Sequence, residues 1–163
     1  SLVEPDMLPL AAEIMALATQ HRCHIMLPSD GVVTPQLKPD AKGTIVPIHT
    51  LQPDDMVVDI GPQTIKAWRP ILQAAKTILW NGPVGAFETV PFNHGTNALV
   101  NLLAEVPGFV LAGGGDTINA IASVRREADF DYISTGGGAL LEYLEGKTLP
   151  ALARLQTKPA KKA

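Results

Sequence analysis

Two glycine-rich segments contain the residue types best suited to chemistry. They are Gly113-Gly114-Gly115-Asp116-Thr117 and Thr135-Gly136-Gly137-Gly138. Where a strand meets a helix, glycines leave backbone N–H groups free to bind an anion, and the amino end of the helix adds positive potential. Asp116 could hold Mg²⁺ against a phosphate, directly or through water, and Thr117 could donate its hydroxyl to a phosphate oxygen. The pattern favours a phosphate-containing ligand.

A structural explanation of the first segment stays open, because Asp116 could simply cap the following helix while the glycines allow a tight turn. The second segment makes that explanation less satisfactory. Two glycine-rich helix starts on neighbouring strand ends would aim N–H donors at one crevice. A polyphosphate, or a phosphoryl group in transfer, needs donors on several sides.

A third segment, Trp80 to Glu88, has the composition of a nucleoside-binding loop. Asn81 offers an amide, and Gly82 and Gly85 would let a flat ring or a sugar approach the backbone. Pro83 and Val84 provide an apolar wall, and Glu88 could accept hydrogen bonds from two ribose hydroxyls. The alternative is a rigid connecting loop with a surface glutamate.

These segments follow predicted strands, and the spacing of apolar residues predicts the elements that position them. Residues 28–43, rich in Pro and Gly, are expected to form a loop with at most a short extended piece, and the helix over 63–75 is expected to be bent or interrupted at Pro70. The predicted strands span 24–27, 44–48, 56–60, 77–80, 109–112 and 132–134, and the predicted helices span 6–20, 63–75, 91–105, 116–126 and 139–145.

Alternation of continuously apolar strands with helices predicts an α/β fold, a doubly wound (Rossmann-like) parallel sheet with helices on both faces. Ligands of such sheets bind beyond the carboxyl ends of the strands. The turns after the strands ending at Ile60, Trp80, Ala112 and Ser134 are therefore the places to search for a site.

Composition narrows the class of protein. Of 163 residues, 46% are hydrophobic, 18% charged and 5% aromatic, which suits one domain with an aliphatic core. A net charge of −3 disfavours a nucleic-acid partner. No apolar run reaches the length of a membrane span, and residues 1–20 lack the basic start of a signal peptide. Cys23 is the only cysteine, which fits a reducing, cytoplasmic setting, and the four histidines show no metal-ligand spacing.

The segment from Trp80 to Glu88 resembles the signature loop of phosphoglycerate kinases. Gly113 to Thr117 resembles the phosphate loop of that family, and Ser134 to Gly138 resembles the start of its last helix. The resemblance runs from about Leu2 to about Leu152, in the family's order, so residues 1–152 are expected to be part of the carboxy-terminal nucleotide-binding domain and 153–163 a tail. Other matching segments are Leu27-Pro28 with Asp30, Asp59-Ile60-Gly61-Pro62, Glu142 and Leu144 to Leu149.

The resemblance implies a glycolytic phosphoryl transfer between 1,3-bisphosphoglycerate and ADP, giving 3-phosphoglycerate and ATP, with Mg²⁺. By motif position, Asn81 would contact the nucleotide phosphates, Gly82, Pro83 and Val84 would border the nucleoside, and Val58 would help to wall the adenine. Glu88 would hold the ribose, Asp116 would be associated with Mg²⁺, and Thr117 with phosphate. Gly113 to Gly115 and Gly136 to Gly138 would stabilise the transferred group.

The departures from the family pattern carry further expectations. No segment matches the amino-terminal domain that binds the phosphoglycerate, or the first strands of the carboxy-terminal domain, one of which supplies a lysine to the transferred group. The resemblance implies a monomeric full enzyme, but this chain is expected to lack two parallel strands, to be inactive alone, and to self-associate through open sheet edges.

Two other functions stay open at this point. The first is a binding module of Rossmann type that holds a dinucleotide, although no Gly-x-Gly-x-x-Gly follows the first strand. The second is an interaction fragment whose nucleotide site is vestigial. Binding of ADP, of NAD or of neither would separate the three hypotheses.

Overall fold

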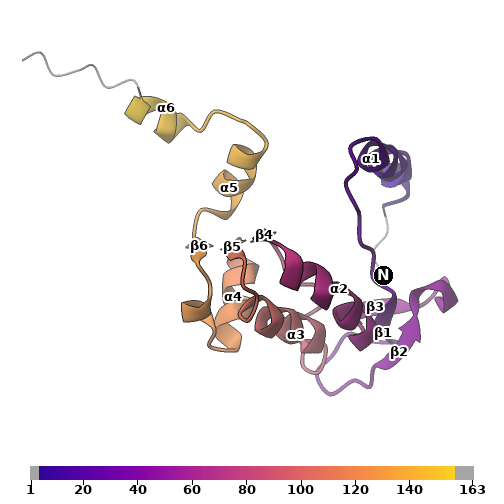
Figure 1. The fold of residues 1–163 in the computed structure, drawn as a ribbon. Coiled ribbons are helices and arrows are strands. Elements are labelled where there is room, and N and C mark those ends of the chain that lie inside the picture. The colour runs from indigo at the N-terminus through magenta and orange to yellow at the C-terminus, as the bar shows by residue number, and fades with distance from the viewer. Residues whose placement is uncertain (1–3, 157–163) are drawn as a thin grey trace, which may run out of the picture.

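The structure, a computed structural model, describes residues 4–156, and Figure 1 shows their arrangement. A parallel sheet and an antiparallel sheet are joined by helices, so the predicted mixed α/β class is confirmed. The elements are η1 (Pro5–Met7), α1 (Leu8–Gln20), β1 (Asp30–Thr34), β2 (Thr44–Pro47), η2 (Ile48–Thr50), β3 (Met56–Ile60), α2 (Pro62–Ala74), β4 (Thr77–Trp80), α3 (His94–Leu103), β5 (Phe109–Gly113), α4 (Gly115–Ser123), η3 (Glu127–Asp129), β6 (Tyr132–Ser134), α5 (Gly137–Leu144) and α6 (Pro150–Gln156).

The parallel sheet has the order β4-β5-β6, and its three strands coincide with predicted ones. Trp80 pairs with Ala112, and Gly113 pairs with Ser134, so the strands end at nearly the same level. Helix α3 connects β4 to β5, and α4 connects β5 to β6. This register brings the carboxyl ends of the three strands to one rim, where the glycine-rich segments begin.

The expectation of a single parallel sheet is wrong for β3. That strand belongs to a separate antiparallel sheet of order β2-β1-β3. Its central strand, β1, lies within residues 28–43, where only a short extended piece was expected. The connection over residues 35–43 explains the antiparallel pairing of β1 with β2, because parallel neighbours need a crossover of a dozen or more residues.

The strand predicted over residues 24–27 is not formed within the described part of the chain. The segment has no regular structure, and Ile25, Met26 and Leu27 are exposed. A strand exists only when a neighbour satisfies its backbone groups, and no described strand pairs with this segment.

The parallel sheet has an open edge at β4, because this strand pairs with β5 alone among the described strands. Self-association through such an edge stays a prediction.

The amino-terminal helix α1 forms where a helix was predicted, but no residue of α1 is buried. Met7, Leu10 and Ile14, which set its apolar spacing, are all exposed. Figure 1 shows α1 standing away from the body of the molecule. Among the described residues, its apolar side chains therefore have no counterpart that buries them.

The main core lies between the parallel sheet and helices α2, α3 and α4. Val100, Ala112, Ala120 and Ile121 are completely buried within it, and the Trp80 ring stacks on Phe130 at a centroid distance of 6.2 Å. Trp68 is partly buried and packs against this cluster. Helix α2 continues through Pro70, so it is not interrupted there, and the alternative expectation of a bend stays a prediction.

The expected division between a domain, residues 1–152, and a tail, residues 153–163, stays a prediction. Gly146, with a φ of 78°, follows the C-cap residue Glu145 of α5, and glycine at this position is typical of a helix end. Helix α6 crosses the expected boundary between residues 152 and 153. The lysine-containing end of the predicted tail lies outside the described residues. No helix in the range 4–156 is long and apolar enough to cross a membrane.

A buried pair, Asp30 and Thr64, joins the antiparallel sheet to α2. The carboxylate of Asp30 accepts hydrogen bonds from the Gln63 amide at 2.9 Å and from the Thr64 amide and hydroxyl, each at 2.7 Å. These amides belong to the first turn of α2, where N–H groups lack partners within the helix. A carboxylate from a distant strand thus caps the helix, and the positive end of the helix favours its charge.

The environment of Asp30 determines how its contribution to stability changes with pH. Burial raises the pKa of Asp30, but the hydrogen bonds from the Thr64 hydroxyl and from the amides of Gln63 and Thr64 outweigh burial, so the pKa lies below its ordinary value of 3.8. A group with a lowered pKa stabilises the folded state above its unfolded pKa. That stabilisation is lost as the pH falls through the folded pKa.

Replacing Asp30 tests this cap. Asp30→Asn should lower the free energy of unfolding near neutral pH by about 2 kcal/mol, because bonds to a charged acceptor are lost. The difference from wild type should shrink as the pH falls below 3.8. Urea denaturation at several pH values measures both effects. The exposed Asp54→Asn serves as the control and should cost little, and a difference that persists at low pH would contradict the assignment.

Candidate functional site

Three segments meet at the carboxyl rim of the parallel sheet: residues 81–88 after β4, 114–117 after β5 and 135–138 after β6. Two close approaches involve glycines. A Cβ built on Gly137 would lie 3.0 Å from the Cα of Gly114, and one built on Gly114 would lie 2.7 Å from Oδ1 of Asn81. The predicted convergence of these segments is therefore present, and side chains larger than hydrogen at positions 114 and 137 would force them apart.

Helices α4 and α5 both begin at this rim with uncapped amino ends. Their N-cap residues are Gly114 and Gly136, and no side chain caps either helix by a hydrogen bond. Gly114 has a φ of 98°, which favours glycine. A Cβ at Gly115 or Gly138 would meet no atom within 4 Å, so the space beside these residues is open. Two sets of backbone N–H groups are thus available to an anion.

The two acidic candidates border one cavity of about 430 Å³. Asp116, in the first turn of α4, and Glu88 are both exposed and lie on its wall with Pro83. Leu37, from the connection between β1 and β2, also lines the cavity and was not anticipated. Asp116 does not occupy the N-cap position, which is held by Gly114, so the alternative interpretation of Asp116 as the helix cap is not supported.

Thr117 has a contact that sequence reasoning did not foresee. It is 1% exposed, and its hydroxyl oxygen accepts a hydrogen bond from the Gly82 amide at 2.8 Å. The buried Thr96 acts similarly, since its hydroxyl oxygen accepts from the Val84 amide at 3.2 Å. Two threonines on α4 and α3 thus fix the loop 81–88 relative to the helices.

Other candidates lie near the rim but not on the cavity that Glu88 and Asp116 share. Asn81 is exposed above Gly114, while Gly82 and Val84 line a different cavity of about 270 Å³ on the Trp68 side. Val58 is buried in a small cluster with Ala41 and Phe92. Its connection to the loop is through the backbone, because the Ala86 amide donates to the Val58 carbonyl at 2.7 Å.

Asp59, which received no role from the sequence, lies beside Gly85 of the loop and joins β3 to the start of α3. It is 2% exposed, and its carboxylate accepts from the Gly95 amide at 2.7 Å and from the Ile60 amide at 2.8 Å. Side chains on Gly85 or Gly95 would overlap this carboxylate. Burial raises the pKa of Asp59 above its ordinary value, against the opposing effects of these two amides and the charge of His94. The feature of the sequence that could have indicated this buried role was a carboxylate within an otherwise apolar predicted strand.

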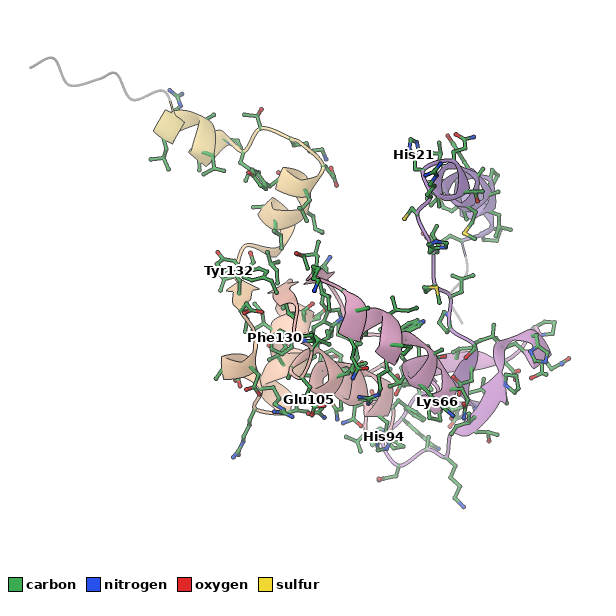
Figure 2. The ribbon with its side chains drawn as sticks, in the orientation of Figure 1. His21, Lys66, His94, Glu105, Phe130 and Tyr132 are labelled. Carbon is green, nitrogen blue, oxygen red and sulfur yellow. The ribbon has the colours of Figure 1, made fainter. Side chains whose placement is uncertain are left out.

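No preformed metal centre exists among the described residues, because no group of three or more His, Cys, Asp or Glu side chains gathers there. Figure 2 places His21 near α1 and His94 on the body of the molecule. The only predicted metal-binding residue, Asp116, therefore supplies a single carboxylate. That donor set fits Mg²⁺ only if phosphate oxygens and water complete the coordination, which is how Mg²⁺ is commonly held beside nucleotides.

Comparison with known proteins identifies the family to which this chain is similar. Residues 1–147 match the family model described as phosphoglycerate kinase. A phosphoglycerate kinase of Nitratidesulfovibrio vulgaris (strain DSM 19637 / Miyazaki F) is 48% identical over 161 residues, which cover 99% of this chain and 41% of that protein.

Two solved structures agree with this match. The phosphoglycerate kinase of Coxiella burnetii is 37% identical with a TM-score of 0.90, and the match covers 95% of this chain and 40% of that one. The enzyme of Pyrococcus horikoshii OT3 is 31% identical with a TM-score of 0.75, covering 93% of this chain and 36% of that one. This chain thus spans about two fifths of the curated relative's length. The match of most of its residues to the family model shows that the chain belongs to the phosphoglycerate kinase family.

Proposed function

We propose that this chain forms the ADP- and ATP-binding part of a phosphoglycerate kinase, with the nucleotide phosphates lying at the rim where Gly114 approaches Gly137. The contact between these two glycines is the observation that carries the proposal. It brings the amino ends of α4 and α5 together without side chains between them. Donors from two helices suit a group whose negative charge is spread over several oxygens.

The loop 81–88 would bind the nucleoside portion. Pro83 and Glu88 line the same cavity as Asp116, so an apolar ring, a ribose and a diphosphate could be held in sequence along it. Glu88 would accept hydrogen bonds from the ribose hydroxyls, and Asn81, above Gly114, would contact a phosphate. Gly82 and Val84 would border the nucleoside from the other face of the loop. Val58 and Thr117 would act by fixing the loop, through the contacts described above.

Asp116 would hold Mg²⁺ together with the nucleotide phosphates, and the ion would neutralise charge on the phosphate oxygens. The cavity lining contains Glu88 and Asp116 but no lysine or arginine. The chain's own contributions would be orientation of the nucleotide, by the loop, and electrostatic stabilisation, by the backbone amides of Gly113 to Gly115 and Gly136 to Gly138.

The proposed reaction is phosphoryl transfer between 1,3-bisphosphoglycerate and ADP, giving 3-phosphoglycerate and ATP. The phosphoglycerate site is proposed to lie on the domain that the family resemblance assigns to its binding, and not on this chain. A role in glycolysis and a cytoplasmic location follow from the same resemblance and stay predictions.

The ribose contact can be tested with a matched pair of nucleotides. Glu88→Gln should weaken ADP binding about tenfold, because a hydrogen bond to a charged acceptor is replaced by one to a neutral amide. It should affect 2′-deoxy-ADP much less. Isothermal titration calorimetry of both proteins with both nucleotides measures how strongly the effect of the Glu88 substitution depends on the 2′-hydroxyl. Equal losses for the two nucleotides would remove Glu88 from the ribose site.

The role of Asp116 can be tested by changing Mg²⁺. Wild-type protein should bind ADP more weakly when EDTA removes the ion, because the Asp116 carboxylate then faces the diphosphate without a cation. Asp116→Asn should lower the affinity for ADP in the presence of Mg²⁺. It should also reduce the difference in ADP affinity between samples with Mg²⁺ and samples with EDTA. The exposed Asp54→Asn is the control. An unchanged Mg²⁺ dependence in Asp116→Asn would contradict the assignment.

The isolated chain should show no measurable phosphoryl transfer. The candidate cavity lacks a cationic side chain to stabilise the transferred group, and electrostatic stabilisation supplies most of the rate in such reactions. A coupled assay of ATP formation from 1,3-bisphosphoglycerate and ADP checks this, with a full-length family member as the positive control. Turnover by the purified 163-residue chain would overturn the expectation.

A further inference from the structure

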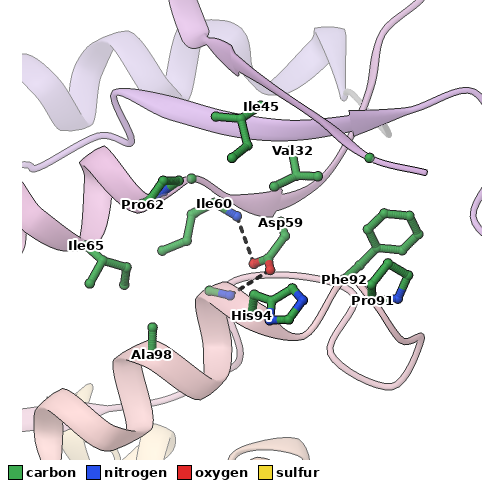
Figure 3. A pocket seen from close by; sticks show the side chains of 13 residues that line it. Val32, Ile45, Asp59, Ile60, Pro62, Ile65, Pro91, Phe92, His94 and Ala98 are labelled. Atoms are coloured by element: carbon green, nitrogen blue, oxygen red, sulfur yellow. Dashed lines mark hydrogen bonds between the residues drawn. The ribbon is translucent and has the colours of Figure 1, made fainter. Parts of the chain in front are cut away.

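A second cavity, of about 510 Å³, lies between the antiparallel sheet and the amino end of α3. Figure 3 shows it from close by, with Ile45 and Val32 above, Ile65 and Ala98 below, and Phe92 at the side. Most of its wall is apolar. Its volume falls within the range of about 300–1,000 Å³ that is usual for sites of small organic ligands.

This cavity is distinct from the candidate nucleotide site. None of the residues that line it also lines the cavity between Glu88 and Asp116. It draws on strands β1, β2 and β3 and the start of α2, none of which belongs to the parallel sheet. A ligand in it would therefore not occupy the position proposed for ADP.

The one carboxylate on its wall is Asp59. In Figure 3 the carboxylate projects between the sheet and α3, with His94 beside it. Each of its oxygens accepts one backbone hydrogen bond, from Ile60 and from Gly95. An ionised carboxylate offers about four acceptor positions, so about half of its capacity remains unused. No lysine or arginine lines the cavity, and the only other titratable group on its wall is His94.

We propose that this cavity binds a small organic cation, an apolar body carrying a primary ammonium group that donates to Asp59. An ammonium group would supply the donors that Asp59 lacks, in surroundings where opposite charges interact more strongly than in water. The apolar body would contact Ile45, Ile65 and Ala98. An anion would be repelled by Asp59, and a pure hydrocarbon would leave the carboxylate without further donors.

Benzylamine, benzyl alcohol and toluene form a graded set of probes for this site. They share a ring of similar size and differ in carrying a cation, a neutral donor or neither. The amides of Gly43, Gly61 and Gly95 belong to lining residues, and their ¹H–¹⁵N NMR signals report binding directly. Benzylamine should shift these signals saturably and bind about tenfold more tightly than toluene. Absence of saturable shifts, or equal affinity for toluene, would overturn the proposal.

Two variants locate the site. Asp59→Asn should abolish the preference for benzylamine over benzyl alcohol, and a retained preference would contradict the proposal. Ala98→Phe places a ring in the cavity without altering Asp59 and should abolish binding, whereas Ala122→Phe, on an exposed part of α4, should leave binding intact. If Asp59→Asn does not fold, Ala98→Phe decides the question, because benzylamine binding that survives in this variant would place the ligand elsewhere.

Titration of ADP into the same samples keeps this proposal separate from the nucleotide site. Loss of benzylamine binding in Ala98→Phe with ADP binding retained would support two independent sites. Failure of ADP to bind wild-type protein would count against the proposed function alone. Failure of benzylamine alone to bind would count against the cation site alone.

Discussion

The contact between Gly114 and Gly137 is the constraint on which the candidate site depends. Parallel pairing of β4, β5 and β6 brings three strand ends to the same level, but ordinary side chains at the following turns would keep the turns apart. Glycine at both positions lets the backbones meet, so the amino ends of two helices point toward one region. Helix α4 is held by the core through Ala120 and Ile121, whereas no residue of α5 is buried. The position of α4 at the rim therefore depends on how its side chains pack in the core.

Two buried carboxylates connect the antiparallel sheet to the rest of the molecule, in different electrostatic situations. Asp30 receives three hydrogen bonds at the start of α2, and its pKa is lowered. Asp59 receives one from Gly95 at the start of α3 and one from Ile60 in its own strand, and burial raises its pKa. The difference follows from the number of donors available to offset desolvation. Both residues require glycine beside them, at Gly61 for Asp30 and at Gly85 and Gly95 for Asp59. These glycines make room for a carboxylate, while Gly114 and Gly137 make room for a backbone.

Sequence patterns located the local elements well and their pairing less well. Strands β3, β4 and β6 have the predicted bounds, because short apolar runs closed by Gly, Pro or Asn are strong local signals. The antiparallel placement of β3 could not be read from the chain, since a buried strand is apolar in either kind of sheet. Likewise, Glu88 and Asp116 were proposed from residue type and family resemblance. The loop-fixing contacts of Thr96 and Thr117, and the bond from the Gly95 amide to Asp59, depend on tertiary neighbours that spacing does not reveal.

No residue of helix α1 is buried, which affects how cooperatively the described chain unfolds. A helix of 13 residues without tertiary support is marginally stable in water, since nucleation is costly and little packing offsets it. Its amide protons should therefore exchange with solvent far faster than those of α3 or β5, which contain the completely buried Val100 and Ala112. The cooperative folding unit of the described chain would then begin near β1, with α1 melting independently of it.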